Sequence, residues 1–313
     1  MTPDPIFAGL VREYLLRTPA QLPAQYFYDA LGSALFDAIC RLPWYRITRA
    51  EQGLLARHAA GMLHGLAAPL SIAELGCGNG EKLATLLSAS SARVTRVQLV
   101  DISQAALAAT RRQLERYDVR DVVEIRAGYH EALDQLSHAR ESGSLAVLFL
   151  GSNIGNFDRA EAAMLLRRLR GALRPGDALI LGTDLVKPER DLLLAYDDPL
   201  QVTAAFNRNI LRRINDELGG TFDLDGFAHR AIWNEVEHRV EMHLVSARRQ
   251  RAEVAACGLE LEFSAGEWIW TESSYKYEPE EVACAGLEAG FAAPRQWLDP
   301  DARFAITRFE VPD

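Results

Sequence analysis

The chain has 313 residues, 49% of them apolar and 25% charged, and 34 Lys and Arg against 43 Asp and Glu give a net charge of −9. The high apolar fraction excludes an intrinsically disordered chain, and a length of this order favours two domains. The acidic balance argues against a phosphate-backbone partner, so no nucleic acid is expected to bind.

The predicted elements alternate between helices and strands through the first part of the chain. Residues 1–50 are predicted to be helical, with turns at Leu22-Pro23 and Leu42-Pro43, and a helix follows at 51–66. Strands are predicted at 71–75, 97–101, 122–125, 145–150 and 178–181, and helices at 81–89, 103–116 and 159–173. Five strands alternating with helices predict an α/β fold with a doubly wound parallel sheet. Ligands of such sheets bind at the carboxyl ends of the strands.

The pattern changes after Asp184. Helices are predicted over 189–217, strands over 230–246 and 260–275, a helix over 278–290, and closing strands over 293–298 and 304–309. We therefore expect a second, smaller α+β domain formed by residues 1–49 and 185–276. The sheet domain is expected to contain residues 50–184 and 277–313.

Cysteine usage and the N-terminus indicate a cytoplasmic protein. The four cysteines form no CxxC pair and are too few for a disulfide scaffold in a chain of this length. Met1 to Leu10 lacks the basic and apolar regions of a signal peptide. No apolar run approaches the roughly 18 residues of a membrane span. The histidines form no metal-binding pair such as HExxH, so no metal is expected.

A glycine loop follows the first predicted strand, in the segment Glu74-Leu75-Gly76-Cys77-Gly78-Asn79-Gly80. Its third glycine comes one residue earlier than in the GxGxxG fingerprint that binds dinucleotides. This spacing suits a ligand without phosphates, and S-adenosylmethionine is the candidate. Its carboxylate could use the helix N-terminus and the cation Lys82. Asp101 ends the second strand, where an acid accepts hydrogen bonds from ribose. The alternative is a tight strand–helix turn with a solvent-facing Asp101.

Two further segments carry candidate substrate-binding groups. The fourth strand leads into Gly151-Ser152-Asn153-Ile154-Gly155-Asn156-Phe157, in which Asn156 can both donate and accept hydrogen bonds. The alternative for this segment is a polar turn that caps the next helix. Glu272 and Ser274 are two residues apart, so they are predicted to share one face of a strand and to grip a polar or cationic group. The alternative is a solvent-facing strand end.

Further distinctive stretches are Tyr26-Phe27-Tyr28-Asp29, Leu35-Phe36-Asp37, Leu42-Pro43-Trp44-Tyr45, Thr48-Arg49, Phe149 to Asn156, Gly182-Thr183-Asp184-Leu185 and Thr203 to Asn209. Through these stretches the chain resembles, over nearly its whole length, the histidine N-alpha-methyltransferases of ergothioneine biosynthesis. The resemblance implies methyl transfer from S-adenosylmethionine to the α-amino nitrogen of L-histidine, three times, to give histidine betaine (hercynine). It also implies a class I methyltransferase fold and a small-molecule substrate, and we expect a monomer without membrane contact.

The resemblance further implies two sets of site residues. Donor binding falls on Gly76, Gly78, Lys82, Asp101 and Tyr129. Histidine binding falls on Tyr28, Tyr45, Gly151, Asn156, Tyr196, Met242, Glu272 and Ser274. Among these, Asn156 and Tyr196 would hold the substrate carboxylate, Glu272 and Ser274 the imidazole nitrogens, and Tyr28 and Tyr45 would stand near the amine. Tyr28 and Asn156 are the implied catalytic residues.

The chain departs from the family pattern at three places. Gly128-Tyr129-His130 stands where the family shows Gly-Asp-aromatic, Trp270 stands where a basic residue is common, and Asn153 replaces a small hydroxyl residue. The last two are expected to border the substrate pocket and to influence specificity. Two other functions therefore remain open at this point: an N-methyltransferase for another amino acid or a small aromatic amine, and a non-catalytic protein that holds the donor.

Overall fold

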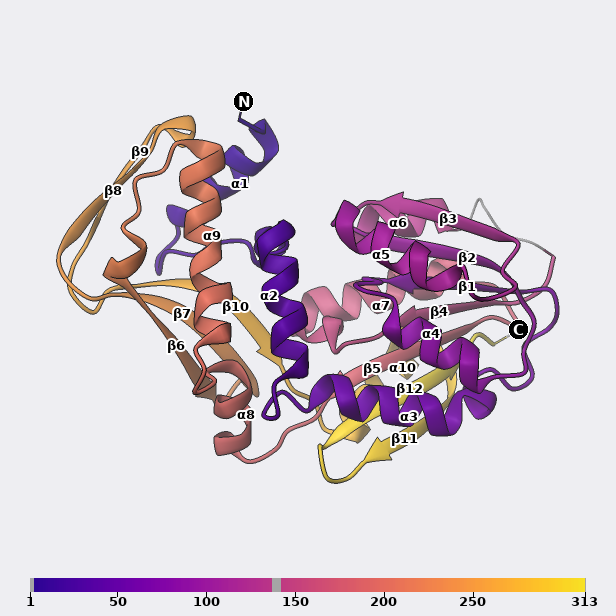
Figure 1. The fold of residues 1–313 in the computed structure, drawn as a ribbon. Coiled ribbons are helices and arrows are strands. Elements are labelled where there is room, and N and C mark those ends of the chain that lie inside the picture. The colour runs from indigo at the N-terminus through magenta and orange to yellow at the C-terminus, as the bar shows by residue number, and fades with distance from the viewer. Residues whose placement is uncertain (1–2, 137–141, 313) are drawn as a thin grey trace. The chain divides into compact units, whose positions relative to one another are not determined.

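The computed structural model describes residues 3–136 and 142–312. The chain divides into two compact units, a larger one of residues 46–187 and 275–313 and a smaller one of residues 1–45 and 188–274. Figure 1 shows the elements of both.

The larger unit is built on a seven-stranded sheet of order β11-β12-β5-β4-β1-β2-β3. Five strands are parallel and correspond to the predicted ones: β1 (Leu70–Leu75), β2 (Val94–Asp101), β3 (Asp121–Arg126), β4 (Leu145–Phe149) and β5 (Ala178–Asp184). The closing strand β12 (Phe304–Glu310) pairs antiparallel with β5, and β11 (Ala292–Asp299) pairs antiparallel with β12. The predicted fold class is thus confirmed.

Helices cover both faces of this sheet (Figure 1). Right-handed crossovers that run outward from β1 to β3 place α4 (Glu81–Ala89) and α5 (Gln104–Leu114) on one face. The helix α3 (Ile47–Met62) packs beside α4. The other face carries α6 (Tyr129–Leu136), α7 (Arg159–Ala172) and α10 (Pro279–Glu288), of which α6 and α10 both pack on α7. Because both faces are covered, β4 and β5 are buried at every residue, which explains the unbroken apolar sequence of β4 and of the first half of β5, residues 178–181.

The smaller unit combines helices with a three-stranded sheet of order β10-β7-β6. Its longer helices are α1 (Pro5–Leu15), α2 (Ala30–Arg41), α8 (Glu189–Tyr196) and α9 (Val202–Leu218). The sheet strands are β6 (Phe227–Asn234), β7 (Arg239–Ser246) and β10 (Trp268–Tyr275), and a separate ladder joins β8 (Gln250–Val254) to β9 (Leu259–Phe263).

Three regions of this unit that are predicted to contain helices or strands each hold two separate elements. The strands expected over 230–246 and 260–275 are each two strands, because turns interrupt them near His238 (φ 51°) and Gly266 (φ +85°). The helical region expected over 189–217 breaks at Gln201 (φ 62°). A residue with left-handed φ ends a regular element, and outside Gly this conformation leaves little sequence signal.

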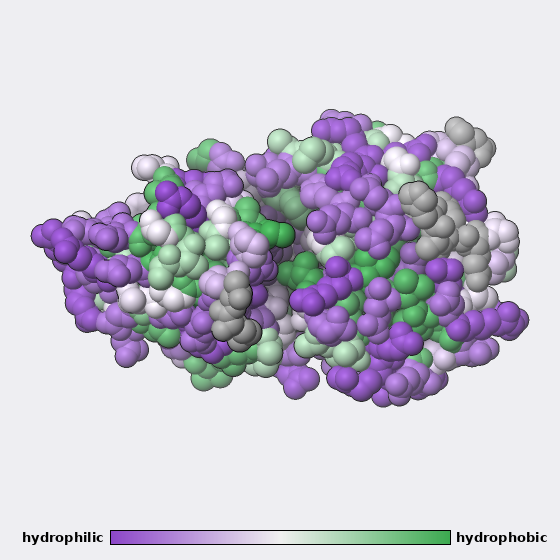
Figure 2. Space-filling model, turned by 90° about the horizontal axis from the view of Figure 1, so that it is seen from above, coloured by the Kyte–Doolittle hydropathy of each residue, from purple (hydrophilic) through white to green (hydrophobic). Residues whose placement is uncertain are grey.

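The molecular surface mixes residue types. On the face that Figure 2 shows, hydrophilic residues predominate and apolar residues are interspersed among them. Among the described residues, none of the helices combines the length and the apolar character needed to cross a bilayer.

Candidate functional site

The glycine loop adopts a backbone that only glycine adopts without strain. Gly76, Gly78 and Gly80 have φ values of +75°, +54° and +78°. The amide of Gly76 donates to the carbonyl of Val100 at 2.8 Å, which ties the loop to the end of β2. A Cβ on Gly80 would lie 2.8 Å from Cγ2 of Thr110, so the loop also packs tightly on α5. The loop therefore presents its backbone, as the donor prediction requires.

Asp101 supports this loop from the neighbouring strand. Its Oδ2 accepts from the amide of Gly78 at 3.1 Å, and its Oδ1 accepts from the amide of Ser103 at 2.9 Å. Burial raises the pKa of Asp101, although the amide hydrogen bonds oppose the rise. Asp101 is half-buried, and its carboxylate is hydrogen-bonded to the loop itself.

Lys82 is held by a residue that the sequence prediction missed. Its Nζ lies 2.6 Å from Oε2 of Glu51, whose side chain is 0% exposed. The same carboxylate accepts from the amide of Gly151, at 2.8 Å through Oε1 and 2.9 Å through Oε2. The available signal was an acid among Ile47, Leu54 and Leu55, on the buried face of α3.

A second buried carboxylate lies at the end of β1. Burial raises the pKa of Glu74 to about 8, and its Oε2 has no hydrogen-bond partner among the residues that the structure describes. Lys82 lowers the pKa of Glu74, whereas Glu51 raises it. At neutral pH Glu74 thus holds its proton.

Two of the family departures meet against Gly76. A Cβ at Gly76 would lie 2.7 Å from Nδ2 of Asn153 and 2.8 Å from the hydroxyl of Tyr129. The Tyr129 ring packs edge-on against Phe149 at 5.1 Å. The structure therefore puts Asn153 beside the donor loop, a contact that the sequence prediction, which placed it at the substrate pocket, did not include.

The segment after β4 is a short 3-10 helix, Asn153–Asn156, that Ser152 precedes with a φ of 58°. The Ser152 hydroxyl accepts from the amide of Asp184 at 2.9 Å, which anchors the segment to the end of β5. Asn156 is exposed. The alternative that this turn caps the next helix is wrong, because Asp158 and Glu161 form the capping box of α7.

In the smaller unit the structure brings several predicted histidine-binding residues together. The hydroxyl of Tyr196 lies 2.8 Å from Oγ of Ser274. The rings of Tyr45 and Tyr196 are 6.3 Å apart, and Phe36 touches both Tyr45 and Tyr28 through edge contacts.

Met242 and Glu272 both accept hydrogen bonds from neighbouring side chains through their backbone carbonyls. Met242 is 2% exposed, and its carbonyl accepts from the hydroxyl of Thr271 at 2.9 Å. Glu272 is half-buried, and its carbonyl accepts from the indole of Trp270 at 2.9 Å. Trp270 thus braces the backbone of the residue that is predicted to bind the imidazole.

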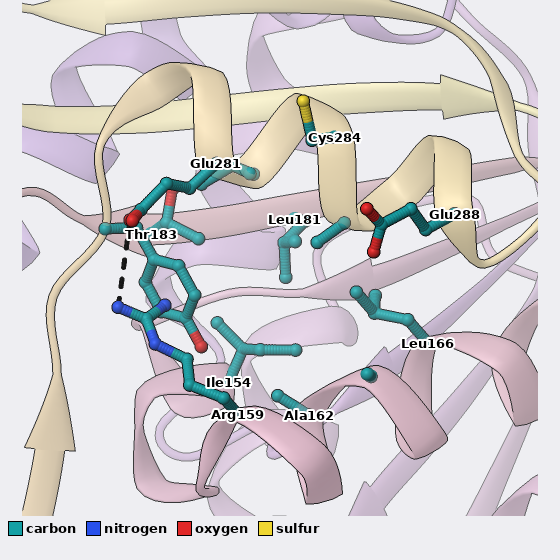
Figure 3. Close-up of a pocket in the computed structure, with 13 residues that line it drawn as sticks. Ile154, Arg159, Ala162, Leu166, Leu181, Thr183, Glu281, Cys284 and Glu288 are labelled. Atoms are coloured by element: carbon teal, nitrogen blue, oxygen red, sulfur yellow. Dashed lines mark ion pairs between the residues drawn. The ribbon is translucent and has the colours of Figure 1, made fainter. Parts of the chain in front are cut away.

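A separate cavity of about 390 Å³ lies between α7 and α10 (Figure 3). Ile154, Ala162, Leu166 and Leu181 give it apolar walls, and an ion pair of 3.7 Å between Arg159 and Glu281 lies at one end. None of the predicted site residues lines it. Within the described ranges, no group of three or more His, Cys, Asp or Glu side chains is arranged to hold a metal ion.

The strand order, the glycine loop and the acid at the end of β2 define a Rossmann-like, S-adenosylmethionine-dependent methyltransferase. A model of the family described as "Histidine-specific methyltransferase, SAM-dependent" matches residues 7–311. The chain belongs to this family, and the predicted resemblance is confirmed.

Individual relatives agree with this assignment. The chain is 42% identical to the histidine N-alpha-methyltransferase of Mycobacterium tuberculosis, over 94% of this chain and 91% of that protein. It is 31% identical to ergothioneine biosynthesis protein 1 of Schizosaccharomyces pombe, over 69% of this chain and 29% of that protein. A solved structure described as a possible exported protein from Bordetella parapertussis has a TM-score of 0.50 at 15% identity, covering 98% of this chain and 95% of its own, and this likeness concerns the fold alone.

Proposed function

We propose that this protein methylates the α-amino nitrogen of L-histidine, three times in succession, with S-adenosylmethionine as the donor. The mycobacterial relative of 42% identity supports the substrate. The observation that carries the proposal is the hydrogen bond between Tyr196 and Ser274, two predicted histidine-binding residues that are 78 positions apart in the sequence and meet at 2.8 Å.

The donor residues of the proposal all lie in the larger unit. Gly76 and Gly78 offer backbone groups, Asp101 offers a carboxylate to the ribose, and Lys82 offers an ammonium to the donor carboxylate. Tyr129 is proposed to contact the donor beside Gly76, near which its hydroxyl lies. When bound, S-adenosylmethionine supplies the electrophilic methyl group, and the protein supplies position and electrostatic field.

The histidine contacts of the proposal are those that the family resemblance implies. Asn156 and Tyr196 hold the substrate carboxylate, and Glu272 and Ser274 bind the imidazole nitrogens. Gly151, Tyr45 and Met242 complete the contacts. Such hydrogen-bonding sites reject analogues that lack the partner group, in the best cases by about 10⁴–10⁵.

The accepting nitrogen must be unprotonated and aligned about 3–3.5 Å from the methyl carbon. A pocket that excludes water and places no carboxylate at the nitrogen favours the neutral amine. We assign Tyr28 to the proton route, with water as the alternative carrier, and no strong general base.

The test is a competition among substrates. The purified protein is incubated with S-adenosylmethionine and an equal mixture of the twenty amino acids, and the products are identified by mass. Gains of one, two and three methyl groups on histidine alone are expected. Methylation of another amino acid would refute histidine as the substrate. Donor binding without any methylation would refute methyl transfer to the amino acids of this panel.

A further inference from the structure

Glu51 is a carboxylate in a place where a hydrocarbon side chain would be expected. It lies on the face of α3 that buries Ile47, Leu54 and Leu55, and it is 0% exposed. Burying a charged carboxylate is costly unless partners compensate it. An apolar residue would satisfy the packing of the helix, so the packing alone does not account for the carboxylate.

The partners of Glu51 come from two different segments. Oε2 lies 2.6 Å from Nζ of Lys82 on α4, and both oxygens accept from the amide of Gly151 after β4. The neighbouring β5 leaves room for this arrangement, because a Cβ on Gly182 would overlap Oε1 of Glu51. Lys82 in turn lies against Gly151, since a Cβ added to Gly151 would be 2.8 Å from Nζ of Lys82.

We propose that Glu51 is a positioning residue that fixes Lys82 for the carboxylate of the donor and, through the Gly151 amide, fixes the segment that receives the amino acid. This inference rests on the proposed function. A lysine ammonium is a point charge on a flexible stem, so it needs a partner to hold one position. Because Glu51 is fully buried, it acts through Lys82 and Gly151.

The first experiment separates positioning from general structural support by the choice of ligand. Binding of S-adenosylhomocysteine and of 5′-methylthioadenosine to the full chain is measured by calorimetry. The second ligand lacks the amino-acid end of the first, so it has no carboxylate for Lys82. We expect Glu51→Gln to lower the affinity for S-adenosylhomocysteine by about tenfold or more, which is the range of a lost charged hydrogen bond. The affinity for 5′-methylthioadenosine is expected to stay within about twofold of the wild-type value.

The matched control is Glu81→Gln, an identical chemical change next to Lys82. Glu81 accepts from Gln52 at 3.2 Å instead. This variant is expected to bind both ligands within about twofold of the wild type, because it leaves the pair between Glu51 and Lys82 intact.

Further variants test the contact with Gly151 and the contact with Lys82 separately. Glu51→Gln keeps an oxygen for the Gly151 amide, whereas Glu51→Leu removes it. Only Glu51→Leu is therefore expected to raise the KM for histidine several-fold at saturating donor. The double variant Glu51→Gln/Lys82→Gln is expected to bind S-adenosylhomocysteine no more weakly than Lys82→Gln alone, because residues that act through one another are not additive.

If Glu51→Gln lowers the affinity for both ligands equally, or if the affinity losses add in the double variant, the inference is overturned and the proposed function still stands. If Glu51→Leu does not fold, the ligand selectivity of Glu51→Gln decides alone. Failure of the wild type to bind S-adenosylhomocysteine would instead overturn the proposed function.

Discussion

Replacing Glu74 by glutamine is expected to change how the stability of the protein depends on pH. The pKa of Glu74 is raised from 4.5 to about 8, chiefly by burial, so the folded chain binds a proton that the unfolded chain has lost between these values. A group of this kind contributes stability that is complete below the unfolded pKa and is lost as the pH rises toward the folded one. Wild-type stability should therefore fall across this window because of Glu74.

The magnitude follows from the size of the shift. A difference of 8 − 4.5, or about 3.5 units, corresponds to roughly 5 kcal/mol at about 1.4 kcal/mol per unit. At pH 7 the difference of about 2.5 units corresponds to roughly 3 kcal/mol. A glutamine side chain at this position would be neutral in both states, so the variant avoids this loss. Its amide adds a packing offset that does not depend on pH.

The assay compares the free energy of unfolding of the two proteins by urea titration between about pH 5 and pH 8. The advantage of Glu74→Gln over the wild type is expected to grow by about 1 kcal/mol or more per pH unit. Repetition at high salt is the control, because salt screens surface charges far more than buried ones. A difference that stays constant across the window would refute the assignment of a buried, protonated Glu74.

Three other substitutions test the site and its support. Glu272→Ala should lower histidine turnover by on the order of 10³ or more while S-adenosylhomocysteine still binds, and parallel losses of both would contradict an imidazole-binding role. Asp101→Ala should weaken S-adenosylhomocysteine and 5′-methylthioadenosine alike by about tenfold, since both carry the ribose; unchanged calorimetric affinities would count against this acid. The side chain of Asn207 is 0% exposed, its Nδ2 lies 2.8 Å from Nδ1 of His229, and its Oδ1 accepts from the hydroxyl of Thr271 at 2.7 Å. Asn207→Ala should lower the free energy of unfolding by roughly 1–3 kcal/mol, and an unchanged urea midpoint would refute that.

The sequence predicted the parallel core of the larger unit because burial on both faces leaves long apolar runs. β1, β2, β4 and β5 match their predicted ranges within a few residues. The helix α6 was missed because its buried face consists of Ala132, Leu133 and Leu136 within eight residues, too few for a clear period. β8 was also missed; only Ala252 and Val254 of its five residues are buried.

The donor loop was predictable because its chemistry is local in the sequence. Gly76, Gly78 and Gly80 lie within one turn, and Asp101 ends the next strand. The role of Glu51 was not predictable in this way. A carboxylate on a helix is usually a solvated group, and its partners at Lys82 and Gly151 are 31 and 100 residues away in the sequence. Only tertiary structure brings them together.

The placement of β12 has a consequence for synthesis on the ribosome. Phe304, its first residue, follows Asp184 by 120 positions, yet the two are paired at the end of β5. At about 5–20 residues per second, the nascent chain exposes the unpaired backbone of β5 for roughly 6–24 s while the intervening residues are being made. Every residue of β5 is buried in the finished protein and its first four residues are apolar, so this open edge is ready to pair with another chain. Chaperone dependence during expression should therefore originate at this strand.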